Sequence, residues 1–270
     1  MSAVRTPPPA LPVRDKRAVR ALSPMLTRLA EERATGVLVR EHGVLHLAEG
    51  RVVHAESPLA PGLDVLLTAH GTLAGAAWQR AAARTPSPLH AAELLLSSGV
   101  LPTGALELCH LDALYDAGYF ALAPSSTPGR FRYDHTPRLG PLPSVPVVAL
   151  EHETLRRRLL LHRLWPDPAA DSAPLIRAAP AGRTPAAPVT PRQRAVLDRV
   201  DGLRTAADIA RNLGRQAFHT LVDVRRLTAA GQIAPAPAAP AAPPPTPLHQ
   251  VTTDPDIALL KRLRDALEAL

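Results

Sequence analysis

Proline is the feature of this sequence that most limits how the chain can fold, because more than half of its 31 prolines lie in three stretches. These stretches are residues 1–20, 166–191 and 234–247, and in the last of them seven of fourteen residues are proline. Proline removes an amide donor and fixes φ, so such stretches do not continue a helix or a sheet. We therefore expect a disordered basic arm over 1–20, a Pro-rich linker over 166–189 and a Pro/Ala-rich linker over 234–252.

The composition also excludes several classes of protein. The single cysteine, Cys109, excludes an internal disulfide framework and a multi-thiolate metal site. No apolar stretch reaches the roughly 20 residues of a membrane span, and prolines occupy the place of the apolar region of a signal peptide. We therefore expect a cytoplasmic protein with no membrane partner. The chain is basic, with 31 Lys+Arg against 24 Asp+Glu.

Residues 21–165 have the pattern of an α+β domain. Ser23 and Pro24 are suited to the start of a helix. Three β-prone runs follow, separated by His42-Gly43 and Glu49-Gly50, which suit hairpin turns with positive φ. The runs are 37–40, 44–47 and 52–55, further helices are expected over 61–68, 87–97, 103–117 and 148–164, and a second hairpin is expected to join 119–122 with 130–133. The pattern predicts a small antiparallel meander covered by helices.

Three short helices are expected within residues 190–233. Thr205 and Asp208 form an acidic variant of the capping box, and Leu213-Gly214 marks a tight turn before the third helix. An extended segment begins at Ile233. This order predicts a winged helix-turn-helix, so the complete expected fold class is α+β, with a meander/helix domain, a winged helix, a Pro/Ala linker and a C-terminal helix.

The chain ends in a predicted amphipathic helix over 253–270. Asp254 and Pro255 suit its first turn, and one face carries a stripe of apolar residues, namely Ile257, Leu260, Leu263, Leu267 and Leu270. A helix on a Pro/Ala tether does not bury such a stripe by itself. It must dock on this chain, on a second copy as a homo-oligomer, or on another protein.

The meander resembles the PATAN-type bacterial domain of unknown function. The similar residues are TGVLV at 35–39, then GVLHLAEGRVVHA at 43–55, followed by an amphipathic helix, and the resemblance extends more loosely to about residue 165. It implies a bacterial signalling protein that binds a signalling protein partner, and it implies no catalytic residue. Residues 190–233 are similar to winged-helix segments found at the C-termini of such proteins, through the run VDGLRTAADIA at 200–210.

The third predicted helix would be the DNA-recognition helix of that segment. Residues 190–233 hold eight arginines against four aspartates, and arginine pairs well with guanine edges in the major groove. The residues expected to contact duplex DNA are Arg215, Gln216, His219, Thr220, Arg225 and Arg226. Asp223, one turn after His219, would repel phosphate. The alternative is a solvated face on a winged helix that docks a protein.

Two further clusters have a chemical and a structural interpretation. His46 and His54 face each other across the Glu49-Gly50 turn with Glu56 nearby, which suits either a metal ion or a half-exposed sheet surface. Cys109, His110 and Asp112 suggest a nucleophile, but on a helix they point in different directions, which favours a buried structural thiol.

The sequence lacks the common phosphate-binding, nucleophile-elbow and zinc-protease motifs. We therefore expect no enzyme and no cofactor. The predicted function is a bacterial signalling or transcription regulator, with a protein-binding PATAN-like module and a DNA-binding winged helix. The alternative is a protein-interaction adaptor or scaffold without nucleic-acid binding.

Overall fold

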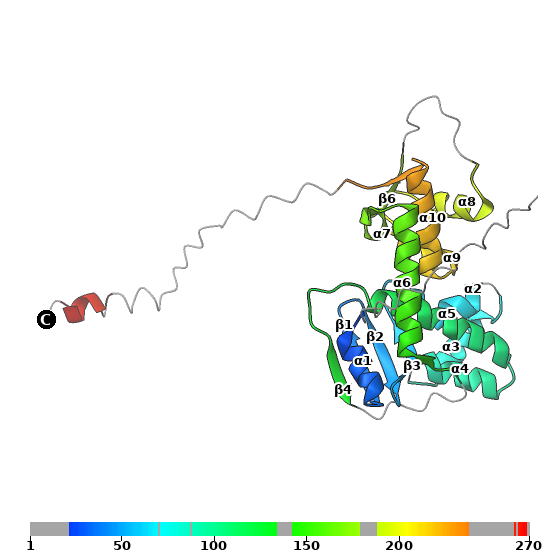
Figure 1. The fold of residues 1–270 in the computed structure, drawn as a ribbon, viewed down its shortest axis with the longest axis horizontal. Helices are drawn as coiled ribbons and strands as arrows, with labels where there is room; N and C mark the ends of the chain where they lie inside the picture. Colours follow the sequence, from blue (N-terminus) through cyan, green and yellow to red (C-terminus); the bar gives the residue numbers. More distant parts are fainter. Residues whose placement is uncertain are drawn as a thin grey trace, which may run out of the picture. The chain divides into compact units, whose positions relative to one another are not determined.

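The computed structural model describes residues 22–69, 71–86, 88–133, 142–178, 188–237, 262 and 264–268. The chain divides into one unit that ends at Ala236 and a second that begins at Pro237. The first unit is a mixed α+β structure with a small antiparallel sheet and several helices (Figure 1).

The sheet has the strand order β4-β1-β2-β3-β5, with every neighbouring pair antiparallel. Its strands are β1 (Gly36–Arg40), β2 (Gly43–Ala48), β3 (Arg51–Glu56), β4 (Arg130–Tyr133) and β5 (Val145–Pro146). The turn between β2 and β3 has φ values of 50° at Glu49 and 75° at Gly50, so the prediction there is confirmed. The prediction of positive φ at His42-Gly43 is wrong, because the turn is Glu41-His42 and Gly43 already belongs to β2.

Helices cover this sheet and extend beside it. They are α1 (Pro24–Glu31), α2 (Leu63–Ala69), α3 (Gly75–Ala82), α4 (Pro88–Ser97), α5 (Thr103–Ala121) and α6 (Val147–Leu164). The Ser23 hydroxyl accepts from the Leu26 amide, which confirms the predicted cap of α1. The expected strand at 119–122 is wrong, since α5 continues to Ala121 and β4 pairs with β1 instead. Gly118 lets α5 and α6 pack closely, because a Cβ at this position would lie 2.7 Å from a methyl of Leu150 on α6.

The remaining elements form a second group of helices with a small sheet of their own. They are α7 (Ala169–Ser172), β6 (Leu175–Arg177), α8 (Pro191–Leu197), α9 (Ala206–Leu213), α10 (Ala217–Ala229) and β7 (Ile233–Pro235). The interpretation of 166–189 as a linker is wrong for 166–178. Ala170 and Leu175 are buried, and β6 pairs with β7 across more than fifty intervening residues. Prolines flank α7 and β6 without interrupting them.

Helix α6 contributes to two of the hydrophobic clusters of the described residues, one at the five-stranded sheet and one around α10. Leu150, near its start, packs with the sheet residues Leu38 and Leu45. Leu161, near its end, packs with Phe218 and Leu221 of α10. Figure 1 shows α6 running alongside α10. Burial of apolar side chains at both ends of one helix holds the two groups of elements together.

Several predictions lie outside the described residues. They are the basic arm over 1–20, nearly all of the 234–252 linker, and most of the 253–270 helix, including Ile257, Leu260, Leu263 and Leu270. Residues 264–268 are helical, with Arg264 paired to Asp265 at 2.8 Å and Leu267 exposed. Among the described helices, none combines the length and apolar character needed to cross a bilayer.

Candidate functional site

Helix α10 starts without a capping residue of its own. Thr190 and Thr205 cap α8 and α9 through complete capping boxes, whereas the Gln216 side chain makes no cap hydrogen bond to α10. The carboxylate of Asp116 on α5 takes this role. It accepts from the amides of Ala217 at 2.5 Å and Phe218 at 2.9 Å, and it is fully buried. These amides belong to the first turn, which has no acceptor within its own helix.

Arg157 of α6 lies beside this cap. Its Nη1 is 3.6 Å from Asp116, and its Nε donates to Glu153 at 2.9 Å. The guanidinium also covers the Phe218 ring, with Cζ 4.6 Å from the ring centre. Burial raises the pKa of Asp116 to about 6, although the α10 amides and Arg157 favour its charged form. The first turn of α10 is therefore enclosed by α5 and α6.

The turn before α10 is enclosed as well. Gly214 has φ of +61°, and a Cβ built on it would lie 1.9 Å from the Cβ of Ala69 on α2. Arg211 of α9 donates to the carbonyl of Pro58, just after β3. The connection between α9 and α10 thus packs against the sheet domain, that is, the five-stranded sheet with helices α1 to α6.

The six residues predicted to contact DNA differ in how exposed their side chains are. His219 and Arg226 are exposed, and Arg215 and Gln216 are half-buried. Thr220 and Arg225 are buried, so their prediction as DNA contacts is wrong for this structure, because neither side chain reaches the surface. Arg225 instead binds Asp171 of α7 through two hydrogen bonds, at 2.6 and 2.7 Å.

The sequence predicts that Asp223 repels phosphate at the surface, and the structure shows that this prediction is wrong. Its side chain is buried, 3.3 Å from Arg192 of α8 and 3.8 Å from Arg215. Arg215 therefore turns toward a carboxylate of its own chain. Burial lowers the pKa of the Arg215 guanidinium, and Asp223 partly offsets that effect.

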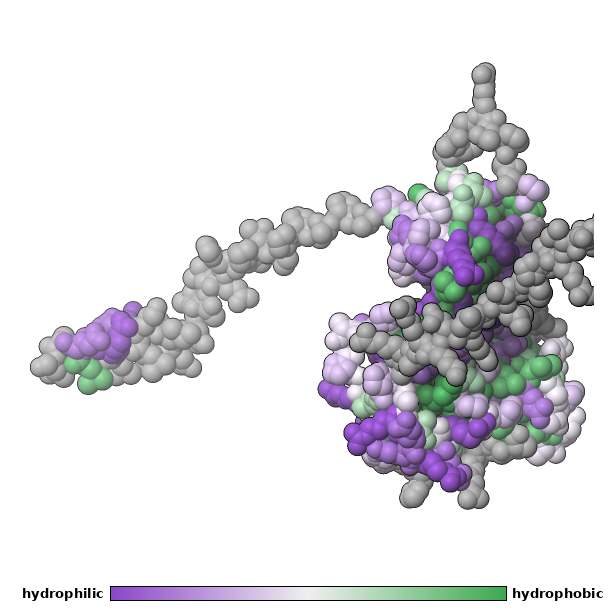
Figure 2. Space-filling view, viewed as in Figure 1, coloured by the Kyte–Doolittle hydropathy of each residue, from purple (hydrophilic) through white to green (hydrophobic). Residues whose placement is uncertain are grey.

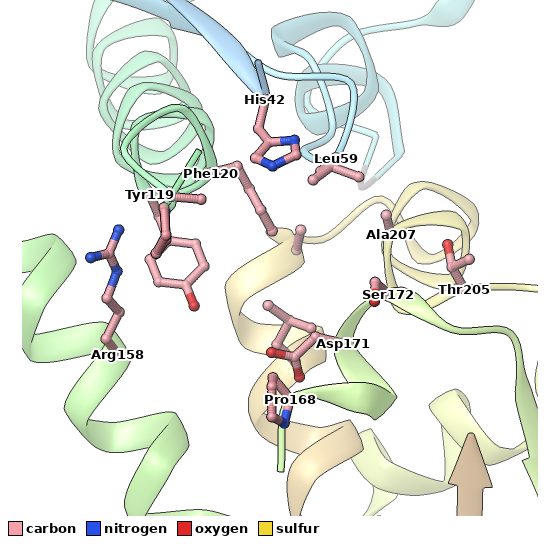
Figure 3. Close-up of a pocket in the computed structure, with 14 residues that line it drawn as sticks. His42, Leu59, Tyr119, Phe120, Arg158, Pro168, Asp171, Ser172, Thr205 and Ala207 are labelled. Atoms are coloured by element: carbon pink, nitrogen blue, oxygen red, sulfur yellow. The ribbon is translucent and has the colours of Figure 1, made fainter. Parts of the chain in front are cut away.

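A cavity of about 510 Å³ opens where the sheet domain meets α7, α9 and α10 (Figure 3). Its apolar wall includes Leu59, Phe120 and Leu221. Figure 3 shows the Tyr119 hydroxyl and Asp171 on the same cavity, with Arg158 beside Tyr119 and His42 on the opposite side. Burial raises the pKa of Tyr119, and the negative charge of Asp171 adds to the effect.

A row of three histidines lies between β2, β3 and α5. His46 and His54 are cross-strand partners with ring centres 5.5 Å apart, and His54 stacks on His110 at 5.8 Å. His54 is buried, so the expectation of a half-exposed sheet surface is wrong for this residue. The described residues hold no group of three or more His, Cys, Asp or Glu suited to a metal ion.

Cys109, His110 and Asp112 do not converge on one point. His110 is fully buried, Cys109 is half-buried and Asp112 is exposed. The expectation of a buried structural thiol is thus only partly correct. Burial raises the pKa of Cys109, and Asp112 adds to the effect, which disfavours the reactive thiolate.

His110 is expected to make the protein less stable in mild acid. Burial, followed by the charge of His54, lowers its pKa from 6.5 to about 4 despite nearby backbone carbonyls of Val53 and Pro143. Between pH 6.5 and about 4, the His110 imidazole is therefore protonated in the unfolded chain but neutral in the folded chain. Between pH 7.5 and 4.5 this difference costs about 2–3 kcal/mol.

The measurement compares urea unfolding of the native chain with that of His110→Phe at both pH values. The variant should lack this part of the acid loss, while the titration of Asp116 is common to both proteins and cancels in the comparison. Equal acid losses in the two proteins would contradict the assignment to His110.

An open apolar groove lies at the β4 edge of the sheet. Its volume is about 560 Å³, and its walls are Pro24, Met25, Arg28, Leu29 and Glu32 with Phe131 and Tyr133. The rings of Phe131 and Tyr133 meet edge to face, with centres 4.8 Å apart. Hydrophilic side chains gather on the same end of the unit in Figure 2. On the side away from β1, β4 pairs with no other described strand.

The residues that join the two groups of elements are absent from the sequence-based predictions. Asp116 and Asp171 belong to no recognised sequence motif, and Tyr119 lies in the segment that was predicted to be a strand. One signal was available for Asp116, since it is an acidic residue between Ala113 and Ala117 on the apolar face of α5. A carboxylate at such a position requires a partner, because a buried unpaired charge is costly.

Comparison of the chain with protein-family models, curated proteins and solved structures finds no match. The resemblance to PATAN-type and winged-helix segments therefore stays a prediction.

Proposed function

We propose that the chain is a protein-interaction adaptor that binds an extended segment of a partner protein along β4. The observation that carries the proposal is the outer edge of β4, which pairs with no other described strand and lies beside the apolar groove of α1. A strand edge offers unpaired amide and carbonyl groups to a second chain, and neighbouring pockets select its side chains.

The side chains of β4 indicate which segment would fit. Arg130 and Arg132 are exposed on one face of the strand, whereas Phe131 and Tyr133 face the groove. Neither arginine forms an ion pair within the described part of the chain. A segment that alternates acidic and apolar residues would place its carboxylates near the arginines and its apolar side chains in the groove.

The test uses a blocked peptide of alternating glutamate and valine, about eight residues long, and its lysine–valine counterpart. The acidic peptide is expected to shift the NMR signals of the β4 amides. Changing Arg130→Glu together with Arg132→Glu should weaken its binding about tenfold or more, because two attractive charges become repulsive.

The matched control is Arg80→Glu with Arg84→Glu, which makes the same charge change at exposed positions away from β4. Equal loss of binding in both double variants would mean that binding depends on net charge and not on the arginines of β4, which would contradict the proposal. Binding of both peptides alike, or shifts confined to other strands, would overturn the proposal.

DNA binding by a winged helix remains a second candidate, favoured by the exposed His219 and Arg226 and by the arginine excess of 190–233. The enclosed start of α10 opposes it, because the first turn of a recognition helix enters the major groove. Salt-dependent affinity for duplex DNA that falls in Arg226→Ala would support this candidate over the adaptor.

A further inference from the structure

The cavity between the sheet domain and α10 has the size and lining of a small-molecule site. Its volume of about 510 Å³ lies within the range of about 300–1,000 Å³ that is usual for ligand pockets. Five elements surround it, namely α5, α6, α7, α9 and α10, together with the β1–β2 turn at His42. Most of its wall is apolar, so a ligand must have a substantial apolar body.

The charges on the wall are not balanced. Asp171 is neutralised by Arg225, whose Nε and Nη2 occupy both of its oxygens. Arg158 has only a neutral partner, since its Nη2 donates to the carbonyl of Leu122 at 2.5 Å. The charged groups that act on Arg158 among the described residues are Tyr119, if ionised, and the like-charged Arg40. Among the described residues that line the cavity, Arg158 is therefore a cation with no carboxylate partner.

The positive charge of Arg40 also acts on Arg158 and adds to this imbalance. It binds the Ser23 hydroxyl and the carbonyl of Ala123, and its buried Nε has no partner among the described residues. Burial and the charge of Arg40 both lower the pKa of Arg158. An anion placed at Arg158 would relieve this repulsion and restore the interactions that desolvation removes.

We propose that the cavity binds a small amphiphilic carboxylate, with the carboxylate at Arg158 and the apolar body along Phe120, Leu221 and Ala207. A planar carboxylate matches the two parallel N–H groups of a guanidinium. A cationic ligand of the same shape would be repelled. This inference goes beyond the adaptor function and does not depend on peptide binding at β4.

Bound in this way, the ligand would touch α5 and α6 on one side and α9 and α10 on the other. A ligand that binds only the folded state adds stability that grows with its concentration above the dissociation constant. The carboxylate would thus strengthen the junction that holds α10.

The experiment is calorimetric titration of the full chain with decanoate, decanol and decylammonium below their aggregation concentrations. Decanoate is expected to bind at one site, decanol about tenfold or more weakly, and decylammonium not at all, because only the first pairs with the guanidinium. Arg158→Gln should weaken decanoate binding about tenfold, whereas Arg158→Lys, which keeps the charge but loses the two parallel N–H groups, should weaken it less.

Two further variants keep the test decisive if Arg158→Gln fails to fold. Ala123→Phe fills the cavity from the loop after α5 and should abolish binding without removing a charge. Arg163→Gln, an exposed arginine on the same helix, is the matched control and should bind decanoate as the native chain does. Absence of saturable decanoate binding, equal binding of decylammonium, or full binding by Ala123→Phe would each overturn the proposal.

Discussion

Replacing Asp116 with alanine is expected to lower the free energy of unfolding by about 3–5 kcal/mol. The change leaves two buried amides of α10 without an acceptor, and it removes one of the two carboxylates near Arg157. Each orphaned buried donor costs about 1–3 kcal/mol, which accounts for the size of the effect. Urea unfolding at pH 7.5 measures it.

Asp112→Ala is the matched control, since Asp112 lies about one turn earlier on α5 with an exposed side chain. Its effect should stay within about 0.5 kcal/mol. Asp116→Asn retains one acceptor oxygen and should lie between alanine and the native chain. A loss below about 1 kcal/mol in Asp116→Ala would mean that the cap does not hold α10.

Arg225→Met should cost about 3–5 kcal/mol, because it leaves Asp171 without its partner in a largely buried site. The same guanidinium also donates to the carbonyls of Leu161 and Trp165 at the end of α6, and these would lose their donor. Methionine keeps most of the side-chain volume, so the loss reports on charge and hydrogen bonds and not on a cavity. Thermal and urea unfolding both measure it.

The neighbouring residue supplies the control for this variant. Arg226→Met changes the same residue type one position later on α10, where the side chain is exposed. It should change the free energy of unfolding by no more than about 0.5 kcal/mol. Comparable losses in Arg225→Met and Arg226→Met would contradict the structural role of Arg225.

Local signals in the sequence predicted local structure well. Three such features are confirmed, namely the Glu49-Gly50 turn and the caps at Ser23 and Thr205. Each was predicted from a few consecutive residues. Such features depend on backbone φ and on hydrogen bonds between near neighbours, both of which residue type controls directly.

Long-range contacts account for the errors. The Asp116 cap joins residues that are 101 and 102 positions apart, and the Asp171–Arg225 pair joins residues 54 apart. Proline content suggested a linker over 166–189, yet Leu175 is buried because β7 returns to pair with β6. Helical spacing places Arg225 on the apolar face of α10 with Phe218 and Leu221, whereas Arg226 lies off that face and is exposed. The prediction of both as DNA contacts did not use this signal.

The most direct test of the structural role of α10 is amide hydrogen exchange at Ala217 and Phe218, followed by NMR in the full chain. Amides in the first turn of a helix exchange quickly unless a side chain caps them. If Asp116 holds the start of α10, both amides should be strongly protected in the native chain and lose that protection in Asp116→Ala. Exchange in the native chain as fast as at Arg192, at the exposed start of α8, would contradict it.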